Sequence, residues 1–269
     1  MRLASLAMYT TPAPIAAATD TLWAYIRDRL RQSALADVPD SLDKTVVYDQ
    51  AWLRPNLLLA QTCGFPYVKK LRGQVQLVAT PVYDLPGCDG PLNRSRIIVA
   101  KASPAASLKD LRGLAAAINE PGSNSGSNLF RAAIAPLAKE GRFFASVIET
   151  GGHLASIDAV ASGKADVAAI DCVTFGNTLR FDPDRLAHVR VLAETPDGPG
   201  LPFITSTATT DDELALMQRI LSEVSTVPEL AAVRDVLSLR RFDILTDGAY
   251  ERLADLERQA ASLGYPSVA

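Results

Sequence analysis

The chain has 269 residues, 48% hydrophobic and 21% charged, a composition typical of a globular protein with a sizeable core. Its 27 Lys and Arg residues nearly balance 30 Asp and Glu residues, so the net charge of −3 provides no basic surface for nucleic acid or an anionic membrane. No apolar run approaches the ~20 residues of a membrane span, and we expect no membrane insertion.

Apolar runs of strand type alternate with helical patterns along most of the chain. In chain order, we predict a strand at 3–9, a helix at 14–32, a helical segment at 51–61 interrupted by Pro55, strands at 74–84 and 96–100, a helical turn at 107–113, a strand at 114–119, a helix at 127–139, a strand at 146–150, a helix at 153–163, strands at 165–171, 189–195 and 201–206, and mostly helix over 210–262. This alternation predicts an α/β fold with mostly parallel sheets flanked by helices.

Two clusters of turn-forming residues divide the chain. They lie at 85–93 and 195–200, where Gly, Pro, Asp and Asn gather. We interpret both as crossings between two lobes. Lobe 1 then comprises 1–84 plus 201–269, and lobe 2 comprises 94–194.

The loop PGSNSGSNLF, residues 121–130, has the composition of an anion site at the start of a helix. Its glycines allow tight turns, and its Ser and Asn residues are favourable helix N-caps. Free amides and the positive end of the helix dipole favour an anion there, and Ser123, Asn124 and Ser125 can add side-chain donors. A plain helix cap after a flexible loop is the alternative. Neither the GxGxxG nor the GxxxxGK[ST] phosphate loop is present.

Two further polar residues lie at the ends of predicted elements. His153 follows Gly151-Gly152 at the start of a helix, where it can donate to an anion or serve as a capping or surface residue. Asp171 lies at the carboxyl end of a strand, where open α/β sheets place ligand groups. It can equally be the N-cap of the following helix.

These motifs resemble a known family. GSNSG, followed by GGHLASIDAVASGKADVAAID, is similar to the phosphonate/phosphite/phosphate-binding family of ABC-transporter substrate-binding proteins. That family carries an STSG-like loop and then G-x-H-x-x-x-(I/L)-x-A-V-x-x-G-x-(A/V)-D-V-A. The segments 57–67 and 81–100 also resemble it, so the likeness spans most of the chain.

The resemblance implies a two-lobed type II periplasmic-binding-protein fold with a hinged cleft, an ABC permease as partner, and no cofactor. The residues Ser123, Asn124, Ser125 and His153 would then hold the oxyanion, and Tyr9 and Tyr83 would contact it from the other lobe. Weaker candidates for the same wall are Tyr48, Trp52 and Gln61, with packing as the alternative role of the first two.

One departure bears on the ligand. Family members that take aminophosphonates place a carboxylate at the position of Val173 in this chain, and Asp171 is the nearest substitute. The resemblance therefore favours phosphate, phosphite or a small alkylphosphonate. By the same resemblance we expect a periplasmic protein, although no signal peptide is recognisable at the start, which leaves a cytosolic location open.

Enzyme function has little support in the sequence. No GxSxG motif or paired carboxylates stand out, and two histidines with three cysteines lacking CxxC spacing argue against a zinc site. The enzyme alternative is a leaderless cytosolic enzyme of the same fold, similar to those of the menaquinone pathway; a cytosolic ligand sensor is a further alternative. Cys63 and Cys88 both lie in turn-rich contexts and could pair, or both could be reduced thiols in or near the core.

Overall fold

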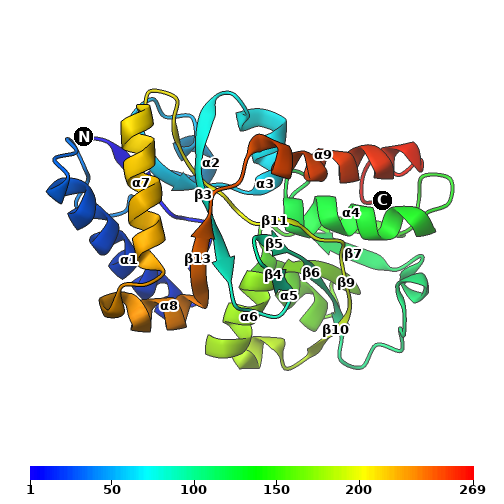
Figure 1. Ribbon diagram of the computed structural model, residues 1–269. Helices are drawn as coiled ribbons and strands as arrows, with labels where there is room; N and C mark the ends of the chain where they lie inside the picture. The colour runs from blue at the N-terminus through cyan, green and yellow to red at the C-terminus, as the bar shows by residue number, and fades with distance from the viewer. The chain divides into compact units, whose positions relative to one another are not determined.

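The computed structural model describes all 269 residues, which divide into two compact units (Figure 1). Unit 1 comprises Met1–Asp84 and Gly200–Ala249, and unit 2 comprises Leu85–Pro199 and Tyr250–Ala269. The chain passes from one unit to the other near the two predicted turn clusters and a third time inside the last helix. Residues 250–269 therefore group with unit 2, whereas the sequence-based division placed all of 201–269 in lobe 1.

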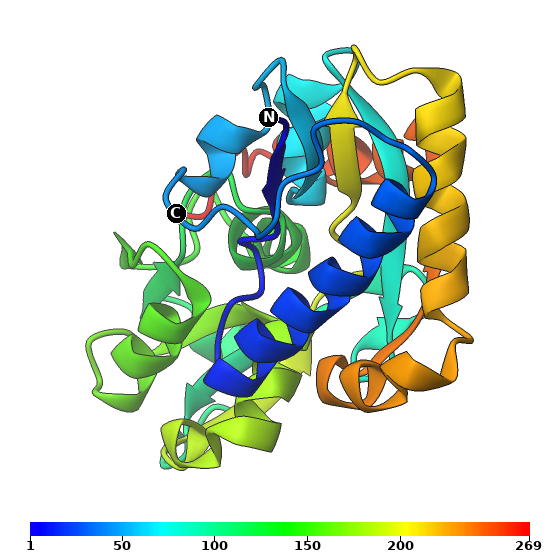
Figure 2. The ribbon, with the colours of Figure 1, turned by 90° about the vertical axis from the view of Figure 1, so that its left-hand side faces the viewer.

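Unit 1 is built on a five-stranded sheet. The strand order is β1 (Leu3–Ser5), β2 (Leu57–Gln61), β12 (Phe203–Ser206), β3 (Val75–Tyr83) and β13 (Leu239–Asp243). Its principal helices are α1 (Ala13–Gln32), α7 (Asp211–Val224) and α8 (Ala231–Leu237), with short turns at α2 (Tyr48–Ala51) and α3 (Gly64–Pro66). Figure 2 shows α1 crossing in front of the strands. The predicted apolar stripe of α1, including Leu22 and Ile26, is buried.

Unit 2 has a second five-stranded sheet and a small three-stranded one. The large sheet has the order β10 (Val189–Glu194), β6 (Ser95–Ala100), β9 (Val167–Asp171), β7 (Ala115–Ile118) and β8 (Ser146–Glu149). The small one consists of β11 (Gly198–Pro199), β5 (Leu92–Asn93) and β4 (Cys88–Asp89). The helices are α4 (Leu129–Ile134), α5 (His153–Ala161), α6 (Cys172–Phe181) and most of α9 (Asp247–Ser262).

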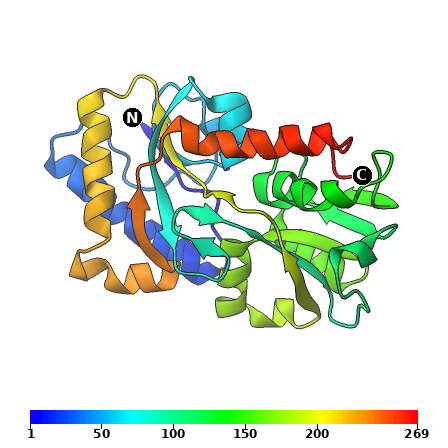
Figure 3. The same ribbon diagram turned by 45° about the vertical axis from the view of Figure 1, so that its right-hand side comes forward.

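Both faces of the large sheet of unit 2 are buried. In β6, Ile97 and Val99 belong to one apolar cluster and Ile98 to another, as alternating side chains of a strand require. One cluster packs with Ile157 and others of α5, and the other includes Tyr265 after α9. Figures 1 and 3 show α4 and the part of α9 in unit 2 side by side. The apolar residues after α9 therefore complete the core of unit 2.

Two sequence-based predictions of local structure are wrong. The two large sheets are mixed rather than mostly parallel, because β12 and β13 in unit 1, and β6 and β10 in unit 2, pair antiparallel with their neighbours. These strands lie near the passages between the units, so they are not joined to their neighbours by the right-handed crossovers that build parallel sheets. Residues 57–61 form a fully buried strand rather than a helix. The prediction of mostly helix over 210–262 is confirmed, with the short strand β13 between α8 and α9.

No helix in the structure combines the length and the apolar character needed to cross a bilayer.

Candidate functional site

The loop at 121–130 is folded into a buried helical turn. Ser123 has extended backbone angles, and its Oγ accepts a hydrogen bond from the amide of Gly126 at 3.2 Å. Residues Asn124–Asn128 then form a π-helical turn, all five of them buried, which continues into α4. Helical structure thus begins three residues before the predicted start at 127. The predicted capping by a loop serine is confirmed at Ser123.

Ser125 and His153 meet at the centre of this region. The Oγ of Ser125 lies 2.8 Å from Nε2 of His153, and Nδ2 of Asn119 lies 3.3 Å from the same ring nitrogen. His153 is the first residue of α5, and Asn119 directly follows β7. The structure therefore brings together the predicted loop and the predicted histidine, 28 residues apart in sequence.

Burial determines the protonation of His153. It lowers the pKa of the ring, while the negative charge of Asp171 and the carbonyl of Ala169 act in the opposite direction. The ring is therefore neutral at pH 7. In the tautomer that carries its proton on the buried Nδ1, Nε2 accepts a hydrogen bond from the hydroxyl of Ser125; in the other tautomer, Nε2 donates to that hydroxyl.

This pKa predicts a pH dependence of stability. In the unfolded chain, a histidine has its usual pKa of about 6.5 and binds a proton below that pH. In the folded state, His153 has a lower pKa and binds the proton less readily. The contribution of His153 to stability is therefore lost as the pH falls below 6.5. We expect His153→Asn to reduce the loss of unfolding free energy between pH 7 and pH 5.5 in urea titrations. His188→Asn, at an exposed position, is the matched control. If the free energy of unfolding of His153→Asn depends on pH as that of the wild type does, the prediction of a neutral, buried ring is wrong.

Asp171 is the N-cap of α6. Its carboxylate accepts hydrogen bonds from the amide of Thr174 at 2.8 Å and from its hydroxyl at 3.3 Å. The residue is buried, and its charge acts on His153. The capping alternative is thus confirmed, and a contact between Asp171 and a ligand stays a prediction.

Two supporting residues escaped the sequence analysis. Ser95, at the start of β6, donates from its hydroxyl to the carbonyl of Ser125 at 2.9 Å and so fixes the loop to the sheet. Asn119 lies so close to the loop that a Cβ on Gly126 would be 1.5 Å from its Oδ1. The position of Asn119 at the carboxyl end of a predicted strand was the only signal for it.

In unit 1, the structure brings three further candidates together. Tyr9, Tyr83 and Gln61 line one small cavity of about 30 Å³. The tyrosine rings meet edge to face with their centroids 5.9 Å apart, a favourable aromatic geometry. The amide of Gln61 donates to the carbonyl of Leu201 at 3.2 Å. Gln61 therefore already has a structural hydrogen bond.

Tyr48 and Trp52 form a separate aromatic pair, with ring centroids 5.4 Å apart. The indole of Trp52 is buried and donates to the carbonyl of Gln61 at 3.0 Å. Neither residue lines the cavity of the two tyrosines. These contacts support the packing role for Trp52.

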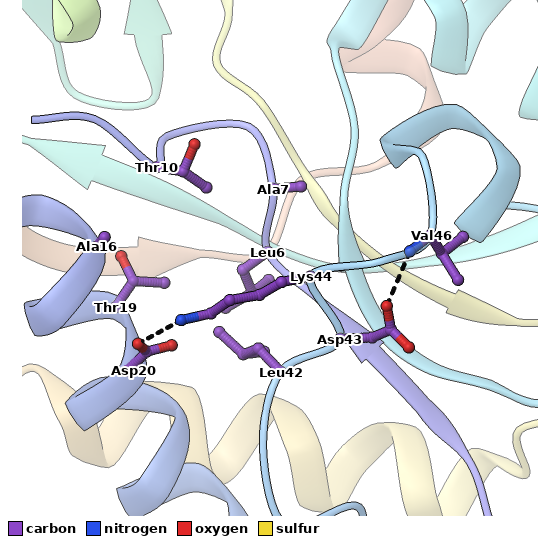
Figure 4. A pocket seen from close by; sticks show the side chains of 10 residues that line it. All are labelled: Leu6, Ala7, Thr10, Ala16, Thr19, Asp20, Leu42, Asp43, Lys44 and Val46. Atoms are coloured by element: carbon purple, nitrogen blue, oxygen red, sulfur yellow. Dashed lines mark hydrogen bonds and ion pairs between the residues drawn. The ribbon is translucent and has the colours of Figure 1, made fainter. Parts of the chain in front are cut away.

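A larger pocket of about 330 Å³ adjoins the segment after β1 (Figure 4). Lys44 and Asp20 form an ion pair of 2.7 Å there, and Asp43 accepts hydrogen bonds from the amides of Thr45 and Val46. These amides lower the pKa of Asp43. Lys44 therefore pairs with one of the two carboxylates of this pocket, and backbone amides hold the other. No group of three His, Cys, Asp or Glu side chains in the structure is arranged to hold a metal ion.

Comparison with known proteins gives a family for this chain. The model of the family described as "ABC transporter, phosphonate, periplasmic substrate-binding protein" matches residues 8–250. Among curated proteins, none matches the sequence significantly.

Solved structures share the fold at low sequence identity. A binding protein component of an ABC phosphonate transporter from Pseudomonas aeruginosa is 16% identical, with 98% of this chain and 87% of that one covered and a TM-score of 0.77. PhnD1 from Prochlorococcus marinus, in complex with methylphosphonate, is 15% identical, with 97% of this chain and 98% of that one covered and a TM-score of 0.74. The periplasmic aliphatic sulphonate binding protein SsuA from Escherichia coli is 18% identical, with 92% of this chain and 85% of that one covered and a TM-score of 0.59.

These likenesses show that the fold is that of the two-lobed, type II periplasmic binding proteins. The family consists of substrate-binding proteins rather than enzymes, so the enzyme alternative finds no support. With a family match over nearly the whole chain, this protein belongs to the phosphonate-binding, periplasmic substrate-binding proteins of ABC transporters.

Proposed function

We propose that this protein binds a small phosphorus oxyanion, namely phosphate, phosphite or an alkylphosphonate, and delivers it to an ABC importer. The family supports solute binding and a transporter partner, and the family is periplasmic. The single observation that carries the choice of an oxyanion is the contact between Ser125 Oγ and His153 Nε2 at 2.8 Å. It joins a hydroxyl donor and a neutral imidazole at the start of a helical turn.

This pair is suited to exchange an internal hydrogen bond for a ligand. Without a ligand, the hydroxyl of Ser125 donates to Nε2 of His153. An oxyanion can accept that hydroxyl proton instead. In the tautomer that carries its proton on Nε2, the neutral ring can then donate to a second oxygen. The first amides of a helical segment, which have no acceptor within it, add further donors for the same anion.

The structure also supports a ligand without an amine. Val173, where aminophosphonate binders of this family place a carboxylate, is buried. Asp171, the nearest acid, already accepts hydrogen bonds from Thr174. An ammonium group would therefore meet no free carboxylate at this point, and its desolvation would oppose binding.

We propose that residues of unit 1 make the remaining contacts to the ligand. The hydroxyls of Tyr9 and Tyr83 would bind the ligand, with Tyr48, Trp52 and Gln61 as weaker candidates. Ligand-driven closure, a shift of population toward the ligand-bound form, would make these contacts and present the loaded protein to the importer.

A thermal-shift titration tests the proposal directly. We expect phosphate, phosphite or methylphosphonate to raise the Tm in a concentration-dependent way, because a ligand that binds only the folded state stabilises it. Sulfate, taurine and 2-aminoethylphosphonate are the comparison ligands, and they should give smaller shifts. Equal shifts with sulfate would contradict selectivity for phosphorus. No shift with any phosphorus compound would overturn the proposed ligand class.

A further inference from the structure

Two cysteines of unit 2 lie side by side. The Sγ atoms of Cys88 and Cys172 are 3.4 Å apart, although 84 residues separate them in the sequence. Cys88 begins β4 in the small sheet, and Cys172 is the first residue of α6. Neither forms a disulfide in the structure, nor does Cys63, which is buried in unit 1. The thiol beside Cys88 is therefore Cys172, and not Cys63, whose pairing with Cys88 was one of two alternatives left open by the sequence.

The backbone around the two thiols holds them in this position. The amide of Arg94 donates to the carbonyl of Gly87 at 2.9 Å, and its own carbonyl accepts from the amide of Cys172 at 3.2 Å. One residue thus fastens both segments. Gly87 has a φ of +98°, and a Cβ on it would lie 2.8 Å from the Cβ of Cys172. Glycine is therefore required for this close approach.

We propose that Cys88 and Cys172 form a reversible disulfide when the protein is in an oxidising compartment. The periplasm is such a compartment, and it is where this family functions. A disulfide needs the sulfurs about 2.05 Å apart, so the observed contact requires only a small movement. This inference is independent of the identity of the ligand.

The oxidant is a small-molecule disulfide or the active-site disulfide of an oxidised oxidoreductase. Cys88, the half-buried thiol, loses its proton and attacks one sulfur of that disulfide, forming a mixed disulfide and expelling one thiolate. Cys172 is buried, and the hydrogen bond with Cys88, together with burial, raises its pKa. Its sulfur then attacks the sulfur of Cys88 and expels the second thiolate. The two protein thiols are oxidised, the external disulfide is reduced to two thiols, and the two protons pass to them.

The bond would enclose the part of the candidate site that lies in unit 2 within one covalent loop. The residues Ser125, His153 and Asp171 all lie between Cys88 and Cys172 in the sequence. Closing a loop of this length restricts the unfolded chain. Oxidation would therefore stabilise unit 2 without adding a contact to the ligand site.

Thiol counting and mass spectrometry test the bond. We treat the reduced full-length protein with an excess of oxidised glutathione and count thiols after denaturation. We expect one free thiol, a mass lower by two hydrogens, and a proteolytic fragment that joins Cys88 to Cys172. Reduction should lower the Tm by roughly 5 to 10 °C.

Three variants separate the outcomes. Cys63→Ser should retain the bond and have no free thiol after oxidation. Cys88→Ser and Cys172→Ser should each retain two free thiols and show no effect of reduction on Tm. Three free thiols in the oxidised wild type, or a fragment that contains Cys63 in place of Cys172, would overturn the proposal. Because Cys88 is only half-buried, its serine variant is expected to fold.

Discussion

Replacing Gly126 by alanine should lower the free energy of unfolding by about 2 kcal/mol and remove oxyanion binding. The added Cβ would lie 1.5 Å from Oδ1 and 2.5 Å from Cγ of Asn119, so the Asn119 side chain must move away from His153. Overpacking of this kind typically costs 1–3 kcal/mol. Urea unfolding measures the first effect, and calorimetry with the ligand found by thermal shift measures the second.

Two controls identify the clash as the cause. Gly122→Ala changes a glycine of the same loop whose added Cβ meets no atom within 4 Å, and it should leave stability nearly unchanged. Asn119→Ala removes the atoms that the new methyl would strike. In that background, the additional cost of Gly126→Ala should fall below 1 kcal/mol. If Gly126→Ala lowers the free energy of unfolding equally in both backgrounds, the clash with Asn119 is not the cause of the destabilisation.

The second large effect concerns the proposed anion contact itself. His153→Ala should weaken oxyanion binding by roughly 1–3 kcal/mol, the range for losing a hydrogen bond to a charged group. That corresponds to about 5- to 150-fold in Kd at 25 °C. Ser125→Ala should have a smaller effect, because the amide donors of the turn would remain. Isothermal titration calorimetry measures both values.

A double-mutant cycle strengthens this test. If the ligand replaces the hydrogen bond between Ser125 and His153, removing either residue also changes the partner of the other, and the combined loss should differ from the sum of the single losses by at least 0.5 kcal/mol. His188→Ala, the exposed histidine, is the matched control and should bind like the wild type. Unchanged affinity in His153→Ala would remove this residue from the proposed site.

Much of the fold followed from patterns of local sequence. The buried stripe of α1 and the short buried strand β9 have periodicities that a single segment determines on its own. The error at 57–61 has a physical reason, since a short apolar run is equally compatible with a buried helix and a buried strand. Antiparallel pairing of β12 and β6 depends on partners distant in the chain, which no local pattern encodes.

The candidate site was predictable to a similar degree. Loop composition indicated Ser123 and Ser125, and the family motif indicated His153. Their meeting at 2.8 Å, by contrast, depends on tertiary packing. Ser95 acts on the loop backbone and Asn119 on the ring of His153. A position at the end of a strand was the only sequence signal for Asn119, and no pattern indicated Ser95. The pairing of Cys88 with Cys172 was missed for the same reason, since contacts across 84 residues do not follow from turn composition.

The division of the chain also has a consequence for the order of folding during synthesis. Most of unit 2 is translated before residue 200, yet its core includes Ala260, Tyr265 and Val268, and the carbonyl of Ala269 accepts hydrogen bonds from the amides of Phe143 and Phe144. Unit 1 has all its residues once Ala249 has been made. Unit 2, most of which is synthesised before residue 200, is therefore the last to complete its core. During synthesis, residues 85–199 lack part of their core until residues 260–269 have been made.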